Sequence, residues 1–267
     1  MKLKVIKNRR ILAAYFHQDF SLHAYSLGDL DDFYWSRVTC FGLDTFSGAE
    51  AVSVLYQGDG LPVLLAFSQP GLMNKDYFLQ LSTLLPDQFY AHLSPNFDQF
   101  FADRYEMEDF GEHYKMSLEK PGLLFIPGME KTSRLTEDDL PEMIKLYEVS
   151  YPGNAFDPRM ILTEQYFGYR DQGKLVSIGG VHVYSQDFEV ATLGNITTHP
   201  DFRNRGFGRV VTARICSSLL DSVNFIGLNV KCDNFHAINL YKSLGFKISS
   251  KFGEFSFKKA PKPLFSL

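Results

Sequence analysis

A short basic segment in the second half of the chain has the residue types and spacing needed to bind a phosphate group. A strand ends at His199-Pro200, a basic loop follows, and Gly206 and Gly208 open a helix. Glycines let a backbone approach a ligand closely and adopt positive φ. The N–H groups of the first helical turn, with the helix dipole, then form a site for a pyrophosphate. This segment alone leaves a solvated, basic helix start as the alternative.

Positive charge and a second segment add to the pattern. Arg203, Arg205 and Arg209 surround the two glycines. About 25 residues downstream the chain reads Asn-Phe-His-Ala-Ile-Asn-Leu-Tyr-Lys-Ser-Leu-Gly-Phe, from Asn234 to Phe246. Asparagine is a preferred N-cap, so this second segment predicts a helix that begins at its asparagine and is stopped by its glycine.

Taken together, the two segments resemble the GNAT superfamily of acyl-CoA-dependent N-acyltransferases. The spacing Arg-x-x-Gly-x-Gly after a strand ending in His-Pro is similar to motif A, and Asn-x-x-Ala-x-x-x-Tyr ending in Leu-Gly-Phe is similar to the second signature. The resemblance covers roughly residues 131–258, and the two-lobe layout is also similar to the glycine N-acyltransferase-like branch. It implies an α/β (α+β) fold with a mixed, mostly antiparallel central sheet flanked by helices, and an N-terminal degenerate GNAT-like lobe.

The resemblance also implies the site residues and the co-substrate, acetyl-CoA, with no metal. In the family, the strand before motif A splays from its neighbour, and its free backbone groups hold the acetyl and pantetheine arm. Tyr241 is the expected catalytic residue, with its hydroxyl directed at the thioester sulfur. The expected cofactor-binding residues are Ile196, Thr197, Thr198, Arg203, Asn204, Arg205, Gly206, Phe207, Gly208, Arg209 and Asn234.

The chemistry of acyl transfer explains why a tyrosine suits this position. An amine attacks the thioester carbonyl, and backbone N–H groups can stabilise the oxyanion that forms. The departing thiolate then needs a proton, and a phenol with an ordinary pKa near 10 is a suitable general acid for a thiol with a pKa near 8.5. A core aromatic on the buried face of the helix is the alternative interpretation of Tyr241.

The general base stays unassigned. Some members of the family carry a glutamate five residues before the asparagine of the second signature, where this chain has Asn229, which cannot accept a proton. Glu189, His182 and Asp187 near strand turns, and His199 after the splayed strand, are candidates that equally suit ordinary structural roles. A water relay or a neutral amine would remove the need for a strong base.

The elements that position these residues follow from periodicity and turn signals. Thr136 and Asp139 suit a capping box before a helix whose apolar stripe is Leu140, Met143, Ile144 and Tyr147. The remaining expected elements, in order, are strands 166–170, 174–184 and 188–198, a helix from about 206 to 222, strand 225–231, a helix at about 235–244, and strands 246–252 and 254–258.

The first half repeats part of this order in degenerate form. Residues 89–118 and 227–257 both give a strand, Asn-Phe, an amphipathic helix, a short strand, Phe-Gly-Glu and a final strand. Upstream, residues 51–56 and 62–67 suit a strand pair, and 75–85 suit a helix. The segment 67–75, which would match motif A, lacks the pattern Arg-x-x-Gly-x-Gly, so we expect no second acyl-CoA site in this half.

Composition narrows the class of protein. The 267 residues suffice for two domains, which we place at 1–127 and 128–267 on either side of Pro-Gly breaks. A net charge of -4 argues against nucleic-acid binding, three scattered cysteines make no zinc site or disulfide framework, and no apolar run could span a membrane. Without a recognisable signal segment, we expect a cytoplasmic protein.

The predicted function is transfer of an acetyl group from acetyl-CoA to a primary amine of a small molecule or peptide, with no nucleic-acid or membrane partner and with a homodimer left open. A non-catalytic acyl-CoA-binding sensor or scaffold is the alternative. A dinucleotide-dependent oxidoreductase fits worse, because no Gly-x-Gly-x-x-Gly follows an early strand.

Overall fold

The computed structural model describes residues 2–45, 48–68, 75–119 and 126–261, which divide into two compact units. Unit 1 comprises residues 1–114 and 250–267, and unit 2 comprises residues 115–249. Each unit is therefore not simply one half of the chain, because the last segment returns to unit 1. The predicted division into an N-terminal lobe at 1–127 and a GNAT domain at 128–267 stays a prediction.

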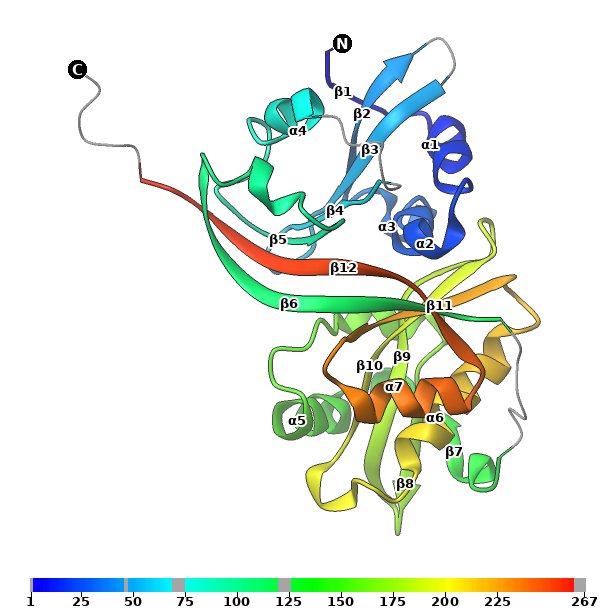
Figure 1. The fold of residues 1–267 in the computed structure, drawn as a ribbon. Coiled ribbons are helices and arrows are strands. Elements are labelled where there is room, and N and C mark those ends of the chain that lie inside the picture. The colour runs from blue at the N-terminus through cyan, green and yellow to red at the C-terminus, as the bar shows by residue number, and fades with distance from the viewer. Residues whose placement is uncertain (1, 46–47, 69–74, 120–125, 262–267) are drawn as a thin grey trace. The chain divides into compact units, whose positions relative to one another are not determined.

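Unit 2 contains the predicted phosphate-binding segment (Figure 1). Its strand order is β6, β11, β10, β9, β8, β7. The pairs β7–β8, β8–β9 and β9–β10 are antiparallel, and the pair β10–β11 is parallel, so the sheet is mixed as expected. Its elements are the end of β6 (Tyr105–Leu118), β7 (Thr132–Arg134), α5 (Leu140–Ser150), β8 (Phe167–Asp171), β9 (Lys174–Ser185), β10 (Val190–Thr198), α6 (Phe207–Leu219), β11 (Phe225–Lys231), α7 (Phe235–Ser243) and the start of β12 (Phe246–Lys259).

Helices α5 and α6 cover opposite faces of the unit 2 sheet. Ile178 on β9 belongs to a buried cluster with Met143 and Tyr147 of α5. A Cβ built on the next residue, Gly179, would lie 3.2 Å from the Ile215 side chain of α6. Successive residues of a strand point to opposite faces, which places the two helices on the two sides. The predicted stripe of α5 is wrong at Ile144, which is 43% exposed.

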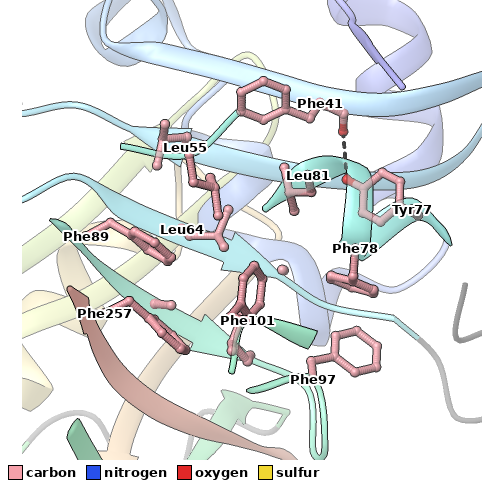
Figure 2. Close-up of a cluster of buried hydrophobic side chains, with 14 of the residues drawn as sticks. Phe41, Leu55, Leu64, Tyr77, Phe78, Leu81, Phe89, Phe97, Phe101 and Phe257 are labelled. Atoms are coloured by element: carbon pink, nitrogen blue, oxygen red, sulfur yellow. Dashed lines mark hydrogen bonds between the residues drawn. The ribbon is translucent and has the colours of Figure 1, made fainter. Parts of the chain in front are cut away.

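Unit 1 has the strand order β1, β2, β3, β4, β5, β12, β6, and its strands β4 and β5 are parallel. Its core is rich in aromatic rings, and Figure 2 shows Phe89 and Phe257 stacked beside Phe101. The Tyr77 hydroxyl donates to the carbonyl of Phe41 at 3.1 Å. Its elements before β6 are β1 (Lys4–Val5), α1 (Arg9–Phe16), α2 (Phe20–Gly28), α3 (Asp32–Trp35), β2 (Val38–Thr45), β3 (Gly48–Tyr56), β4 (Val63–Ala66), α4 (Lys75–Leu81) and β5 (Gln88–Leu93).

Two expectations about the repeated segments were wrong. The two predicted final strands are one strand, β12, which passes through Gly253 paired with Leu93. A Cβ at Gly253 would lie 2.5 Å from the Phe255 ring, so this glycine makes room for a neighbouring aromatic and does not end the strand. In the first repeat, the expected helix is only the 3-10 turn 98–100, and β6 is likewise continuous.

A carboxylate on β12 is held between polar side chains of unit 1. Glu254, 18% exposed, lies 2.6 Å from Nε2 of His113 on β6 and accepts a hydrogen bond from the Tyr90 hydroxyl on β5. Burial alone would raise its pKa, but the hydrogen bonds from His113 and Tyr90 and the nearby His92 lower the pKa to about 2. A carboxylate with a lowered pKa stabilises the folded state only while it is ionised.

We therefore expect Glu254→Gln to destabilise the protein in a pH-dependent way. The wild-type advantage should be complete above the ordinary carboxyl pKa of 4.5 and lost as pH falls toward 2. Its size at pH 7 is on the order of 3 kcal/mol. Urea unfolding of both proteins at pH 7 and at pH 3 measures it, with Glu108→Gln, an exposed carboxylate of β6, as the control. An equal penalty at the two pH values would assign the loss to packing.

Candidate functional site

The sheet of unit 2 opens between β10 and β11. The parallel pairing runs from Val190 opposite Phe225 to Leu193 opposite Leu228. Beyond that point both strands continue, β10 to Thr198 and β11 to Lys231. The backbone of residues 194–198 thus extends past the register that joins it to β11. The role expected for it, holding an acyl and pantetheine arm, stays a prediction.

A β-bulge in β10 lies at this opening. Gly194 pairs with Gly180 and Thr197 with Ile178, so two residues of β10 oppose one residue of β9. The extra residue is accommodated at Asn195, which has a φ of +54° and is 4% exposed. Ile196 and Thr197, two of the predicted cofactor-binding residues, follow immediately. A bulge bends a strand and changes the direction of its backbone groups, which suits a site built from backbone.

The loop after β10 brings a helix N-terminus next to the opening. Asn204 and Gly206 have φ of +61° and +83°, and Gly206 is the N-cap of α6. The first helical hydrogen bond runs from Val210 to the Gly206 carbonyl, so the earlier N–H groups of the turn have no acceptor within the helix. A Cβ at Gly208 would lie 3.3 Å from the Thr198 hydroxyl, so this glycine permits the close approach of α6 to the end of β10.

The predicted arginines contact the protein around this loop. Arg203 donates to the carbonyls of Thr198, at 3.2 Å, and of Ser150, at 3.1 Å, which ties the loop to the end of α5. Arg205 pairs with Asp171 at 3.2 Å and lies over the ring of Phe207, and Phe207 stacks on Tyr169. The Nε of Arg209 donates to the Ser243 hydroxyl of α7 at 3.1 Å. The arginines therefore shape the loop as well as supplying charge.

Tyr241 and Asn234 lie on the helix α7 that the sequence predicts. The Asn234 side chain accepts a hydrogen bond from the N–H of Ala237 at 3.1 Å, which confirms it as the N-cap. Tyr241 is 9% exposed, and its ring lies 5.9 Å from that of Phe246. Burial raises the pKa of the Tyr241 phenol, and the nearby phenol of Tyr151 raises it further. The hydroxyl therefore holds its proton at neutral pH, as a general acid must.

The candidate bases differ in their surroundings. Glu189 accepts from the Asn224 side chain at 2.6 Å, and Asp187 is exposed in the turn before β10. His199 caps a short 3-10 turn by accepting from the N–H of Asp201 at 3.3 Å. The His182 ring lies against Gly194, and a Cβ built on Gly194 would overlap this ring. Burial lowers the pKa of His182 to about 4, so this imidazole is neutral at pH 7.

The corresponding place in unit 1 is closed. There the parallel strands β4 and β5 pair up to Ala66 and Leu93, and the next N–H, of Ser94, donates to the Ala66 carbonyl at 3.1 Å. The Ser94 hydroxyl in turn accepts from the N–H of Ser68 at 3.1 Å. These bonds join the ends of β4 and β5 in unit 1, whereas the corresponding strands of unit 2, β10 and β11, are no longer paired there. Residues 69–74 of the segment compared with motif A lie outside the described residues.

Two general properties concern the described part of the chain. Within it, no cluster of three or more histidine, cysteine, aspartate or glutamate side chains is arranged to bind a metal ion. None of the helices described combines the length and hydropathy required to cross a bilayer.

Two curated proteins match parts of this chain in sequence. An uncharacterised Mycobacterium leprae protein is 36% identical over 104 residues, covering 36% of this chain and 27% of that protein. The ribosomal protein bS18-alanine N-acetyltransferase of Salmonella typhimurium is 44% identical over 57 residues, covering 21% of this chain and 38% of that protein. The chain thus matches between about a quarter and two fifths of the length of these curated relatives.

Solved structures extend the likeness to both units at the level of fold. A Drosophila protein aligns with a TM-score of 0.74 and 14% identity over 98% of this chain and 99% of its own. A tandem GNAT protein from the clavulanic acid biosynthesis pathway aligns with a TM-score of 0.56 and 13% identity, over 98% of this chain and 100% of its own. The model of the acetyltransferase (GNAT) family matches residues 132–246, the stretch that contains the open strand pair, the glycine loop and Tyr241. Residues 132–246 therefore form a domain of the acetyltransferase (GNAT) family.

Proposed function

We propose that this protein is an acetyl-CoA-dependent N-acetyltransferase whose acceptor is a primary amine of a small molecule or a peptide. One observation carries the proposal: β10 and β11 part after Leu193 and Leu228, and the uncapped first turn of α6 follows β10 at that opening. An extended thioester arm needs the first feature, and a pyrophosphate needs the second. The relative from Salmonella acts on an alanine of a ribosomal protein, which supports including peptide amines among the acceptors.

Each part of the site then has a task. The N–H groups of residues 207–209 would bind the pyrophosphate, and the backbone of Ile196, Thr197 and Thr198 would orient the arm. The amine nitrogen attacks the thioester carbon, the carbon–sulfur bond breaks, and Tyr241 donates its proton to the departing sulfur. Solvent restores that proton, and the proton lost by the amine passes to a base or to water. Asn234, already committed to its cap, would bond the pantetheine arm with its remaining amide hydrogens. The proposal includes a cytoplasmic location.

Acetyl-CoA should raise the melting temperature of the protein, and an amine panel should release free thiol from it. A ligand at 100 times its Kd adds about 2.7 kcal/mol to the free energy of unfolding. Differential scanning fluorimetry with acetyl-CoA, and with NAD as the matched nucleotide control, measures binding; thiol release with small amines and with peptides measures turnover. No shift at millimolar acetyl-CoA would contradict the proposal, and tight binding without turnover of any amine would favour a sensor.

A further inference from the structure

Three buried polar side chains meet at the bulge of β10. Tyr147 of α5 donates its hydroxyl to the backbone carbonyl of Asn195 at 2.9 Å. The side-chain amide of Asn195 donates to the Tyr166 hydroxyl at 3.0 Å, and that hydroxyl donates to the carbonyl of Val181 on β9 at 3.1 Å. Tyr147, Asn195 and Tyr166 are 3%, 4% and 0% exposed. We call these three residues the bulge network.

The bulge network holds the one residue of the strand whose backbone is left-handed. Asparagine tolerates positive φ better than most residues, yet that conformation still carries strain and persists only where neighbours determine it. Here the phenol of Tyr147 holds the carbonyl of Asn195, and the phenol of Tyr166 holds its side chain. Burial raises the pKa of Tyr147 and of Tyr166, so both phenols keep the protons that they donate.

The hydrogen bond from Tyr147 fixes the direction of a whole peptide group. A peptide is planar and trans, so a carbonyl of Asn195 held toward α5 directs the N–H of Ile196 the opposite way. Neither tyrosine belongs to the segments that resemble the family signatures, and both lie outside the loop and the helix α7. Both tyrosines reach the opening through Asn195, Tyr147 by its backbone carbonyl and Tyr166 by its side chain.

From this arrangement we infer that Tyr147, Asn195 and Tyr166 are positioning residues for acyl transfer: they set the orientation of the Asn195–Ile196 peptide, against which the thioester must lie. The inference rests on the proposed function for its catalytic consequence, but the orientation of the peptide is a property of the protein alone. Loss of the network should therefore loosen residues 194–198 and slow the chemical step, while the phosphate site at α6 stays intact.

Tyr147→Phe tests the inference, because it removes the hydroxyl and keeps the ring. The matched control is Tyr184→Phe, on the same sheet and outside the bulge network. We expect amide hydrogen exchange at residues 194–198 to become at least about tenfold faster in Tyr147→Phe and to stay unchanged in the control. The rate constant kcat should fall about tenfold, the factor that one buried hydrogen bond supports, with little change in KM for acetyl-CoA or in the acetyl-CoA melting shift.

Tyr166→Phe is the second variant and covers the case in which Tyr147→Phe does not fold. It removes the hydroxyl that accepts from the Asn195 side-chain amide and donates to the Val181 carbonyl, and it keeps the ring. Faster exchange at residues 194–198 in either folded variant supports the inference, even if no amine is ever turned over. Unchanged exchange in the folded variants overturns it, and so does a fall in acetyl-CoA affinity matched by an unchanged kcat. Absence of any acetyl-CoA effect on the wild type would overturn the proposed function instead.

Discussion

Replacing Tyr241 by phenylalanine should lower kcat by about 10²–10⁴ while the protein keeps its fold. The variant removes the hydroxyl that we assign to protonation of the departing thiolate, and general acid catalysis contributes a factor of this size. KM for acetyl-CoA should change little, because the hydroxyl acts mainly in the transition state. Burial raises the pKa of this phenol, so the wild-type acid does not lose its proton near neutral pH. Steady-state kinetics under conditions where chemistry limits the rate measure the effect.

The structural interpretation of Tyr241 makes the opposite forecast. Its ring is buried near Phe246, so Tyr241→Ala should cost about 3–5 kcal/mol of stability through the cavity that it leaves, by analogy with Phe→Ala. If the ring alone mattered, Tyr241→Phe would turn over normally and only the alanine variant would fail. A phenylalanine variant that keeps more than about a third of the wild-type kcat would show that water or another group protonates the sulfur.

Gly206→Val should abolish the melting shift produced by acetyl-CoA. Gly206 has a φ of +83° at the N-cap of α6, a conformation that a β-branched residue resists. A Cβ there meets no protein atom within 4 Å, so the new side chain would extend into open space at the start of α6, where the proposed phosphate site lies. The loss of binding would therefore come from the space that the phosphate needs as well as from the backbone.

Gly173→Val separates these two causes. Gly173, in the turn between β8 and β9, also has a φ of +83° and also has no atom within 4 Å of a built Cβ. Both variants should lose similar stability from backbone strain, about 1–3 kcal/mol. Only Gly206→Val should lose the response to acetyl-CoA in scanning fluorimetry. A normal acetyl-CoA shift in a folded Gly206→Val protein would mean that this loop is not the phosphate site.

Local sequence signals predicted the parts of the site that depend on backbone. The glycines and the asparagine cap require particular conformations, so the start of α6 and of α7 could be placed to within a residue or two. The bulge at Asn195 was missed, although Gly194-Asn195 inside a strand is a recognisable sign of one. Tyr147 was recognised only as an apolar position of a helix. Its hydrogen bond to Asn195 joins residues 48 apart in the sequence, and no local pattern encodes such a pairing.

The errors in the repeated segments have the same origin. Phe-Gly-Glu suggests a turn between two strands, yet Gly253 pairs with Leu93 in the middle of β12. Whether a glycine breaks a strand or makes room for a ring depends on the neighbouring strand, which the sequence alone does not supply. The short segment after Asn96 shows the reverse case, in which apolar spacing suggested a helix but only a 3-10 turn forms.

The division of β12 between the units sets the order in which a ribosome can finish them. Most of unit 1 precedes unit 2 along the chain, but β5 pairs with residues 253–258, which are synthesised only after the whole of unit 2. Domains usually fold in the order of their synthesis. Here the unit that starts first must wait with one side of β5 unpaired, while residues 115–249 are already free to fold. Unit 2 can thus complete its fold during translation before unit 1, although most of unit 1 is encoded first.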